Sequence, residues 1–484
     1  MLEMNLLKKE ENIQQLQGFK NMKKRQKVTA VFDIGKTNKK FFLFDKGFNV
    51  VHKEYIHFDE IKDEEGFPTE DLSALQKWLK DVFYRVIESE VFDVIAINFS
   101  TYGASFVHLD EKGEPLTPLY NYLKSIDKEL RTSFFEKYGP EDEFLKTTGC
   151  SGLSFLNSGM QLYWLKYKKP EIYNKIKYTL HLPQYLSYIF TGIPISEYTS
   201  IGCHTALWDY EKRDYHEWVY KENINQILAP IVSTETSTNM NYNGKRIKIG
   251  VGIHDSSAAL LPYVRSIKKR FVLVSTGTWS IVFNPFAKTP IATDSNYKDQ
   301  INYMRINGKP VKATRLFLGN EYKIQIKKLT EHFNVDEDHH KSVKFDYDTF
   351  FEITKDFQNY FKWESIVTDD MPEMTKIPFN KFEHAYHQLM VELVILQTKC
   401  IKEAVMNDDI RQIYVDGGFS DNDVYIKLLS HYFREKKLRT TDASLGSALG
   451  AAISISDTKL NSKFLKKSYA LKKHVPFIIR DQIS

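Results

Sequence analysis

Cysteine is scarce in this chain, which has three cysteines in 484 residues. Cys150, Cys203 and Cys400 lie far apart, and none forms a C-x-x-C pair or the Cys/His spacing of a zinc site. This pattern excludes a disulfide-stapled fold and a structural zinc module, and we expect a reducing compartment.

Long apolar runs are missing as well. No segment approaches the roughly 18 consecutive apolar residues that a membrane helix requires. Near the N-terminus, Leu6 and Leu7 are followed at once by Lys8, Lys9 and Glu10, so no signal-peptide core is present. We therefore expect a cytoplasmic protein with no membrane partner.

Neither sign of charge dominates the chain. Sixty-seven Lys and Arg stand against 62 Asp and Glu, a formal net charge of +5 that is spread along the sequence, so nucleic acid is not the expected partner. Apolar and aromatic residues are plentiful, at 42% and 14%, which is enough for large buried cores. At this length we expect two large lobes.

An apolar segment at residues 28–34 runs through a short polar turn into a second apolar segment at 39–45. The pattern predicts a strand, a tight turn and a strand. Backbone N–H groups in a Gly-containing turn can point at phosphate oxygens, Thr37 and Asn38 can donate further hydrogen bonds, and Asp33 can hold hydrated Mg²⁺. A plain turn is the alternative, because hairpins with Asp, Gly and Asn are common in proteins that bind nothing.

The residues Gly35-Lys36-Thr37 also match the end of a G-x-x-x-x-G-K-[ST] phosphate loop. That motif needs a Gly where this chain has Ala30, and it leads into a helix, whereas residues 41–44 are Phe-Phe-Leu-Phe and predict a strand. We therefore interpret the segment as a strand-turn-strand phosphate grip and exclude a P-loop.

The order of the remaining elements predicts an α/β fold with two similar halves. The first half continues with a third strand at 50–58, a helix from Thr69 and a strand at 94–99. The second half is expected to contain strands at 271–275 and 279–283, a long helix from Phe382, a strand at 413–415, and helices from Asp423 and Leu445. This repetition favours a duplicated fold with a nucleotide cleft between the lobes.

These patterns also suggest the domain boundaries. We predict a lead-in at 1–27, an N-terminal lobe at 28–262, a C-terminal lobe at 263–460 and a tail at 461–484.

Asp255 ends an apolar strand that starts near Ile247 and stands at the head of a predicted helix. As an Asp before Ser256-Ser257-Ala258-Ala259 it is a good helix N-cap. The functional interpretation is that its carboxylate accepts the proton of a substrate hydroxyl as that hydroxyl attacks a γ-phosphate. The position of Asp255 shortly before the second turn, at 276–278, favours this role.

Two further turns could touch a nucleotide. Ser275-Thr276-Gly277-Thr278 offers hydroxyls and backbone N–H groups to a polyphosphate. Asp416-Gly417-Gly418 ends a strand, and its paired glycines let the backbone pass close to adenine or ribose; a loop that needs φ > 0 is the alternative.

Together and in this order, the segments closely resemble the FGGY family of carbohydrate kinases, members of the actin-like ATPase superfamily, from about Val28 to Ala452. The family's first phosphate motif, D-x-G-[TS]-[TS]-x-x-[KR], appears at 33–40, with Lys36 and Asn38 where hydroxyl residues are usual. Further segments that follow the family's spacing are Gly149, Leu165, Pro170 and Thr191-Gly192, then Leu207-Trp208-Asp209 with Trp218, and finally 416–420 and 445–452.

The resemblance implies a two-lobed actin-like fold with ribonuclease H-like halves and an ATP-dependent sugar kinase that uses Mg²⁺. Asp255 would be the catalytic base, and Asp33 would hold Mg²⁺ through water. The implied nucleotide-binding residues are Asp33, Gly35, Lys36, Thr37, Asn38, Lys40, Thr276, Gly277, Thr278, Gly319, Asn320, Gly417, Gly418 and Ser420. The implied substrate-side residues are Tyr102, Gly103, Ser105, His254 and Asp255.

His254 narrows the range of sugars expected as the acceptor. The base of rhamnulose and fuculose kinases is likewise preceded by His, and residues 275–280 resemble their G-T-W segment, so a 6-deoxyketohexose is the favoured acceptor. Ser105 stands where those kinases carry an Asp in a T-W-G-V-D-like loop, and a hydroxyl cannot accept hydrogen bonds as a carboxylate does, so the sugar could differ. His254 could instead be structural and fix the loop that holds Asp255.

Two alternatives share the same fold. One is a sensor that binds sugar and nucleotide without catalysis, and the other is an actin-like ATPase that needs no sugar. A homodimer is possible.

Overall fold

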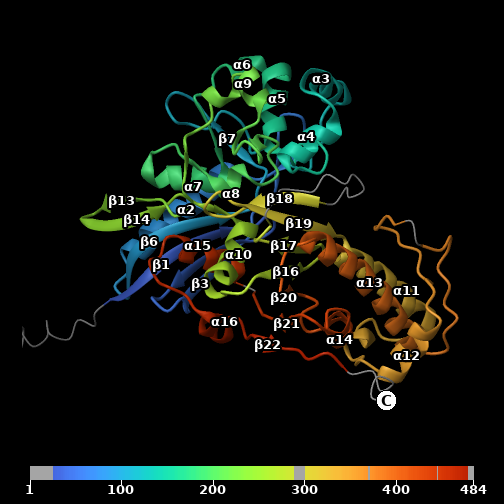
Figure 1. Cartoon of the computed structure of the whole chain (residues 1–484). Helices are drawn as coiled ribbons and strands as arrows, with labels where there is room; N and C mark the ends of the chain where they lie inside the picture. Colours follow the sequence, from blue (N-terminus) through green and yellow to red (C-terminus); the bar gives the residue numbers. More distant parts are fainter. Residues whose placement is uncertain (1–24, 288–299, 369–370, 444, 478–484) are drawn as a thin grey trace, which may run out of the picture.

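The computed structural model describes residues 25–287, 300–368, 371–443 and 445–477. Two seven-stranded sheets form its framework (Figure 1). The first has the order β13-β14-β6-β1-β2-β3, with β15 beside β6, and the second has the order β18-β19-β17-β16-β20-β21-β22. The strands of the first sheet are β1 (Gln26–Ile34), β2 (Lys39–Phe44), β3 (Val50–Ile56), β6 (Phe92–Thr101), β13 (Ser237–Tyr242), β14 (Lys245–Gly250) and β15 (Ile253–His254). Those of the second are β16 (Phe271–Thr276), β17 (Ser280–Asn284), β18 (Gln300–Met304), β19 (Pro310–Leu316), β20 (Gln412–Gly417), β21 (Lys437–Thr440) and β22 (Lys472–Lys473).

The two sheets repeat one topology. β1 pairs antiparallel with β2 and parallel with β6, and β16 pairs antiparallel with β17 and parallel with β20. Each hairpin closes around one of the two turns that the sequence singles out. The predicted duplicated α/β fold is therefore confirmed.

The helices fall into three groups. On the first sheet lie α2 (Leu72–Ile87) and α7 (Leu182–Thr191), and α10 (Asp255–Ser266) and α15 (Gly446–Ser454) lie between the two sheets (Figure 1). The second sheet carries α11 (Leu318–Phe333), α12 (Tyr347–Lys355), α13 (Phe382–Val405) and α14 (Asp423–Tyr432), with the short η2 (His339–Lys341) beside them and α16 (Ser462–Ser468) near the C-terminus. No helix in these ranges combines the length and apolar character needed to cross a bilayer.

The chain between β6 and β13 forms an additional region beside the first sheet, drawn at the top of Figure 1. Its elements are β7 (Phe106–Leu109), α3 (Lys128–Tyr138), α4 (Glu141–Thr148), α5 (Ser158–Lys168), α6 (Pro170–Tyr173), β8 (Tyr178–His181), β9 (Ser196–Glu197), α8 (Tyr198–Ile201), β10 (Trp208–Asp209), β11 (Asp214–Tyr215), α9 (Glu217–Lys221), η1 (Ile224–Gln226) and β12 (Ile231–Val232). A small hairpin, β4 (Ile61–Lys62) and β5 (Pro68–Thr69), precedes α2.

A single apolar core joins the two sheets through α10 and α15. Val31 and Phe42 from the first sheet share this core with Phe271 and Leu273 from the second. Because both sheets bury side chains against the same two helices, the helix pair sets how the sheets lie relative to each other.

The contact between α10 and α15 is unusually close at one point. A Cβ added to Gly450 would lie 1.8 Å from the carbonyl oxygen of Ala258. That carbonyl lacks its normal helical donor, because residue 262 of α10 is a proline and has no N–H. Pro262 therefore leaves the Ala258 carbonyl free, and Gly450 provides the space into which it points.

Most predicted elements occur close to the expected residues, but the helix predicted from Thr69 begins later. It starts at Leu72, because the side chain of Asp71 accepts a hydrogen bond from the backbone N–H of Ala74 at 2.9 Å and caps the helix. Thr69 belongs instead to β5, and its hydroxyl donates to the carbonyl of Leu119.

The lobe boundaries at 28–262 and 263–460 stay a proposal. Most of the predicted lead-in, residues 1–24, lies outside the described residues, as does the end of the tail from residue 478. The described part of the tail contains α16, and β22 pairs with β21 of the second sheet.

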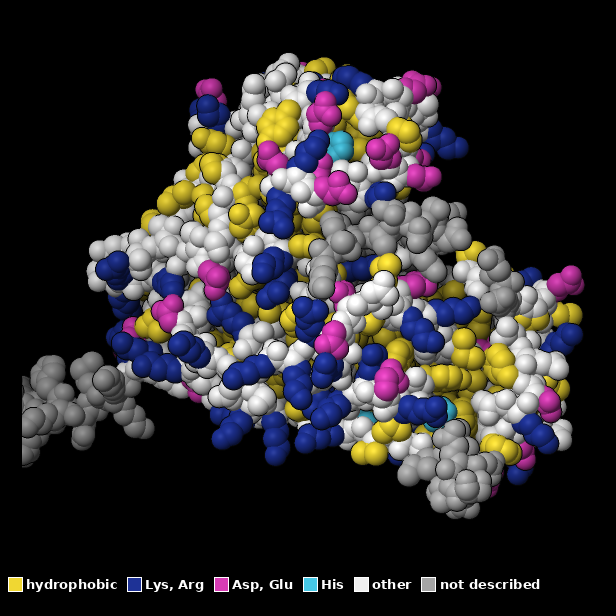
Figure 2. Space-filling view, viewed as in Figure 1, with side chains coloured by type: hydrophobic (Ala, Val, Ile, Leu, Met, Phe, Trp, Pro, Cys, Tyr) yellow, Lys and Arg dark blue, Asp and Glu magenta, His cyan; other side chains and the backbone are white. Residues whose placement is uncertain are grey.

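Positive charge gathers on one edge of the fold. Figure 2 shows Lys and Arg side chains along the lower edge of this face, where Figure 1 places α16 and β22. Lys463, Lys466 and Lys467 belong to α16, and Lys472 and Lys473 form β22. The charge that is evenly spread along the sequence is thus unevenly spread over the surface.

Gly450→Ala should weaken the fold at the helix crossing. The added methyl group meets a backbone carbonyl that cannot rotate away, so we expect a loss of about 1–3 kcal/mol in the free energy of unfolding, measured by urea titration. Gly446→Ala on the same helix is the matched control, because its methyl group would lie 3.3 Å from the side chain of Ala259. Gly450 is in the interior of α15, where Ala gains more helix propensity than at Gly446, the first residue, so a Gly450→Ala variant at least as stable as Gly446→Ala would contradict the close crossing.

Candidate active site

A cavity of about 470 Å³ opens where the N-terminal ends of α10 and α15 meet the carboxyl ends of β16 and β20. Residues from both halves of the fold line it: Asp255, Ser256, Ala259, Ser275, Asp416, Gly417, Ser420, Asp421, Asp442, Ala443, Gly446 and Ser447. Asp255, Gly417 and Ser420 are residues that the sequence selects, and they come together here although Asp255 and Gly417 are 162 positions apart in the chain.

Asp255 is the first residue of α10 rather than its N-cap, which is His254. Its Oδ1 accepts a hydrogen bond from the N–H of Ser256 at 2.5 Å, and about 35% of its side-chain surface stays open to the cavity. Burial raises the pKa of Asp255 to about 6, and the hydrogen bonds from Ser256 only partly offset this. The carboxylate is therefore more basic than an ordinary Asp and is still mostly ionised at neutral pH.

His254 lies against this carboxylate. Its Nε2 is 3.4 Å from Oδ1 of Asp255 and 3.3 Å from Sγ of Cys203. Burial lowers the pKa of His254 to about 3, so the ring is neutral and its Nδ1 has no partner in the described ranges. Gly103 packs against the same edge of the ring, where an added Cβ would lie 2.9 Å from Nε2.

Asp33 is the next-to-last residue of β1, and it is hydrogen-bonded to Ser447, which lines the cavity. Burial raises the pKa of Asp33 to about 6, Lys40 opposes the shift from 3.9 Å, and the charge of Asp255 adds to it. A hydrogen bond from Ser447 on α15 also favours the ionised form. Two carboxylates thus repel each other across a poorly solvated space.

The described residues contain no cluster of three or more His, Cys, Asp or Glu that could hold a metal. A magnesium ion prefers few carboxylates and keeps several waters beside substrate phosphates. The donor set therefore fits such an ion held by Asp33 through water.

The first turn is closed by a hydrogen bond from the N–H of Gly35 to the carbonyl of Asn38, at 3.0 Å. Thr37 and Asn38 are exposed on it. Lys36 bends to acidic partners, with its Nζ 3.0 Å from Oε1 of Glu60 and 3.6 Å from Oε1 of Glu70.

The second turn leaves Gly277 and Thr278 exposed, and the N–H of Gly277 donates to the carbonyl of Trp279 at 2.8 Å. Gly319 and Asn320 pack behind it at the start of α11. A Cβ on Gly319 would lie 2.0 Å from the carbonyl of Gly277, and the N–H of Asn320 donates to the carbonyl of Thr278 at 3.1 Å. In this structure the two residues support the turn.

Gly417 and Gly418 lie beside Thr276, the residue that precedes this turn. Gly417 has φ 81°, and an added Cβ would lie 1.9 Å from the carbonyl of Thr276, so this position requires glycine. The N–H of Gly418 donates to that carbonyl at 2.8 Å. This contact holds the two glycines against the second turn.

Tyr102 and Ser105 do not line the cavity. Tyr102 is buried and its hydroxyl donates to Oε1 of Glu70 at 2.7 Å, while Ser105 is 2% exposed. The sequence places both on the substrate side, and the structure places them beneath the loop that carries Gly103.

Sequence reasoning missed three polar groups near the cleft. Asp416 is buried, which raises its pKa to about 6, and it accepts a hydrogen bond from the hydroxyl of Tyr263 at 3.2 Å. Ser447 and Tyr122 are the others. The sequence places Asp416 at a strand end and Ser447 in the 445–452 segment but assigns no role to either side chain, and nothing local marks Tyr122.

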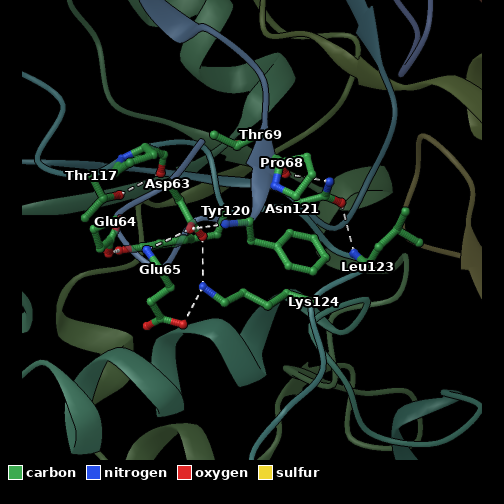
Figure 3. Close-up of polar contacts among 12 residues, drawn as sticks. Asp63, Glu64, Glu65, Pro68, Thr69, Thr117, Tyr120, Asn121, Leu123 and Lys124 are labelled. Atoms are coloured by element: carbon green, nitrogen blue, oxygen red, sulfur yellow. Dashed lines mark hydrogen bonds and ion pairs between the residues drawn. The ribbon is translucent and has the colours of Figure 1, made fainter. Parts of the chain in front are cut away.

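Tyr122 lies near enough to Asp255 and Glu70 for their charges to act on its phenol. Burial raises the pKa of its phenol, and the charges of Asp255 and Glu70 add to the shift. Its loop is fixed on both sides: Asn121 donates to the carbonyl of Pro68 at 2.9 Å, and Nζ of Lys124 binds Asp63 at 2.8 Å (Figure 3). The small hairpin before α2 therefore holds Tyr122 in place.

Known proteins share both the sequence pattern and the fold. Residues 28–257 match the FGGY family of carbohydrate kinases, N-terminal domain. A rhamnulokinase from Oceanobacillus iheyensis is 24% identical over 374 residues, which are 70% of this chain and 74% of that protein. A rhamnulokinase from Halalkalibacterium halodurans is 24% identical over 265 residues, or 51% of this chain and 52% of that protein.

The fold has solved counterparts. The crystal structure of a carbohydrate kinase from Novosphingobium aromaticivorans matches with a TM-score of 0.76 at 22% identity, covering 93% of this chain and 97% of that one. This likeness supports the actin-like fold, whereas support for sugar-kinase activity comes from the sequence matches. The match of residues 28–257 to the N-terminal domain of the FGGY family of carbohydrate kinases, together with the rhamnulokinase relatives, therefore indicates a sugar kinase, a phosphotransferase with an alcohol group as acceptor.

Proposed function

We propose that the chain phosphorylates a hydroxyl of a small ketose with MgATP, and that a 6-deoxyketohexose such as rhamnulose or fuculose is the acceptor. The observation that carries this proposal is the position of Asp255 at the cavity wall, near enough to Asp33 for their charges to interact and beside the neutral ring of His254. The rhamnulokinase relatives and the His-Asp pair support the choice of sugar. The reducing cytoplasm is the proposed compartment, in keeping with three free cysteines.

In the proposed reaction, Asp255 accepts the proton of the sugar hydroxyl while the hydroxyl oxygen bonds to the γ-phosphorus and the bond to ADP breaks. MgATP supplies the phosphoryl group and a cation that balances its charge. A raised pKa suits Asp255 to this work, because a carboxylate with a pKa near 6 takes up a proton more readily than one near 4. His254 keeps the carboxylate in place from its buried position.

The N–H groups and hydroxyls of the two turns would hold the phosphates, with Gly35, Lys36, Thr37, Asn38 and Lys40 on one side and Thr276, Gly277 and Thr278 on the other. Gly417, Gly418 and Ser420 would lie along the nucleoside, with Gly319 and Asn320 supporting the second turn. On the sugar side we propose Gly103, His254 and Tyr122, with Tyr102 and Ser105 shaping the loop from below.

Asp255→Asn should abolish sugar-dependent ADP release. Loss of the base should lower the rate about 10²–10⁴-fold. The assay measures ADP release from MgATP with rhamnulose, fuculose, xylulose, ribulose, tagatose or glycerol as the acceptor. The control variant is Asp214→Asn, because Asp214 is exposed on the surface. A rate that does not depend on any sugar would support the ATPase alternative, and sugar binding without turnover would support the sensor.

The pH dependence of kcat/KM should show the ionisation of both carboxylates. Asp33 and Asp255 have pKa values raised to about 6, so activity should be constant above pH 7 and fall with a slope between one and two in the logarithm below pH 5.5. Lys40→Met should move this fall to higher pH, because Lys40 lowers the pKa of Asp33. A flat profile down to pH 5 would contradict the assignment.

Asp33→Asn should stabilise the fold while it removes activity. The pKa of Asp33 is higher in the folded chain than in the unfolded one, so ionisation destabilises the fold as pH rises from about 4 to 6. The variant should therefore gain on the order of 2 kcal/mol over the parent at pH 8 and lose this advantage near pH 4.

The matched control for this measurement is Asp45→Asn. Hydrogen bonds from Asn49 and Gly47 outweigh burial and lower the pKa of Asp45, so the same substitution there should destabilise at pH 8. Thermal unfolding at several pH values compares the two. The same sign of effect for both variants would show that burial does not raise the pKa of Asp33.

A further inference from the structure

A second cavity, of about 220 Å³, lies on a different face of α10 from the active site. The active-site cavity uses Asp255, Ser256 and Ala259 of this helix. The second cavity is lined by a neighbouring face of α10, on which Ser257, Leu260, Leu261 and Val264 lie three or four residues apart. Its lining residues are Glu235, Ser257, Leu260, Leu261, Val264, Arg265, Met304, Arg305, Ile306 and Asn307.

The two arginines of this cavity differ in their partners. Arg265 donates through Nη1 to the carbonyls of Ile453 and Ser456, and through Nη2 to Glu235. The side chain of Arg305 makes one hydrogen bond within the described ranges, from Nη1 to the carbonyl of Pro285 at a long 3.4 Å, and its Nε is buried without a partner. Within the described ranges no carboxylate lies within ion-pair distance of Arg305.

An incompletely bonded guanidinium in a half-buried position is costly. Taking such a charge out of water is repaid only when an anion and hydrogen-bond acceptors replace the water. Burial lowers the pKa of Arg305, and no neighbouring carboxylate counteracts this. The position is therefore suited to an anion that the protein itself does not supply.

The walls and the charge of the cavity indicate what that anion is. Glu235 is paired with Arg265, which leaves one unpaired positive charge on Arg305. A carboxylate carries one negative charge and fits the planar fork of a guanidinium, whereas a phosphate monoester carries nearly two. Leu260, Leu261 and Val264 offer an apolar wall to the rest of the ligand.

We propose that this cavity binds a small organic carboxylate, with its carboxylate group on Arg305 and its apolar body against α10. The volume corresponds to about seven water molecules, which limits the ligand to a short carbon chain or a single ring. The site is independent of the proposed sugar and of ATP.

The site adjoins the helix of the base. The hydroxyl of Ser257 donates to the carbonyl of Met304 at 2.9 Å, and Met304 is the residue before Arg305. Ser257 lies two residues after Asp255. A ligand on Arg305 therefore contacts the strand end that is bonded to the first turn of α10.

The test uses hexanoate as the probe and the full chain labelled with ¹³C at its methionine methyl groups. Met304 lines the cavity, so its methyl signal, assigned with Met304→Leu, reports occupancy at this place and not at the active site. We expect a saturable shift with a Kd of about 1 mM or below. The uncharged 1-hexanol should produce no saturable shift at the same concentrations.

Arg305→Met should remove the hexanoate-dependent shift while the other methionine signals stay in place, which checks that the variant is folded. Val264→Phe, which fills the cavity, should remove it as well. Arg246→Met, an exposed position on β14, should leave it unchanged. No shift in the parent chain, an equal shift with 1-hexanol, or full retention of the shift in Arg305→Met would overturn the proposal.

Discussion

The groups of the proposed active site depend on how closely α10 and α15 cross. Pro262 has no N–H, so the Ala258 carbonyl of α10 has no helical donor. This carbonyl lies so close to Gly450 of α15 that no side chain would fit there. A carbonyl this close to Cα is consistent with a weak Cα–H···O contact. Because both sheets bury their apolar faces on this pair, any change at the crossing would alter the angle between the sheets.

The same crossing brings two helix N-termini to one cavity. α10 presents Asp255 and α15 presents Ser447, and both helix ends carry partial positive charge from their free N–H groups. That field favours phosphate oxygens and partly offsets the repulsion between Asp33 and Asp255. Burial nevertheless dominates, because it raises the pKa of Asp33, Asp255 and Asp416 and so makes their ionisation unfavourable. These carboxylates lower the stability of the fold, and the raised pKa suits Asp255 to the proposed role of base.

Much of this fold could be predicted from the sequence, because its signals are local. The hairpins at 28–45 and 271–283, and the helix from Asp423, are each determined by a few adjacent residues whose apolar pattern and turn chemistry agree. The helix predicted from Thr69 was wrong by three residues, because Asp71 is also a good cap and its geometry decided the start.

The candidate site was less predictable, because its contacts join residues that are far apart in the chain. The sequence can suggest Asp255 from its place at a strand end, but the approach of Ser447 to Asp33 joins residues more than 400 positions apart. Tyr102 illustrates the opposite case. Its position in the loop after a strand suggests a ligand contact, and only the fold reveals that its hydroxyl is bonded to a buried Glu70.

Lys36 also has a different meaning in the structure. From the sequence it is an extra cation on a predicted phosphate turn, where a hydroxyl would be usual. In the fold it belongs to an ionic group with Glu60, Glu70 and Lys39, in which the buried Glu70 also binds Nζ of the buried Lys39 at 2.8 Å.

This ionic group links the first turn to the loop beside the base. Glu70 accepts the hydroxyl of Tyr102, and Gly103, the next residue, packs on His254. With Glu60 and Glu70 against Lys36 and Lys39, the group is electrically balanced. The lysine therefore adds no net charge around the phosphates, and a turn that departs from the usual motif is compatible with the phosphate contacts of a kinase.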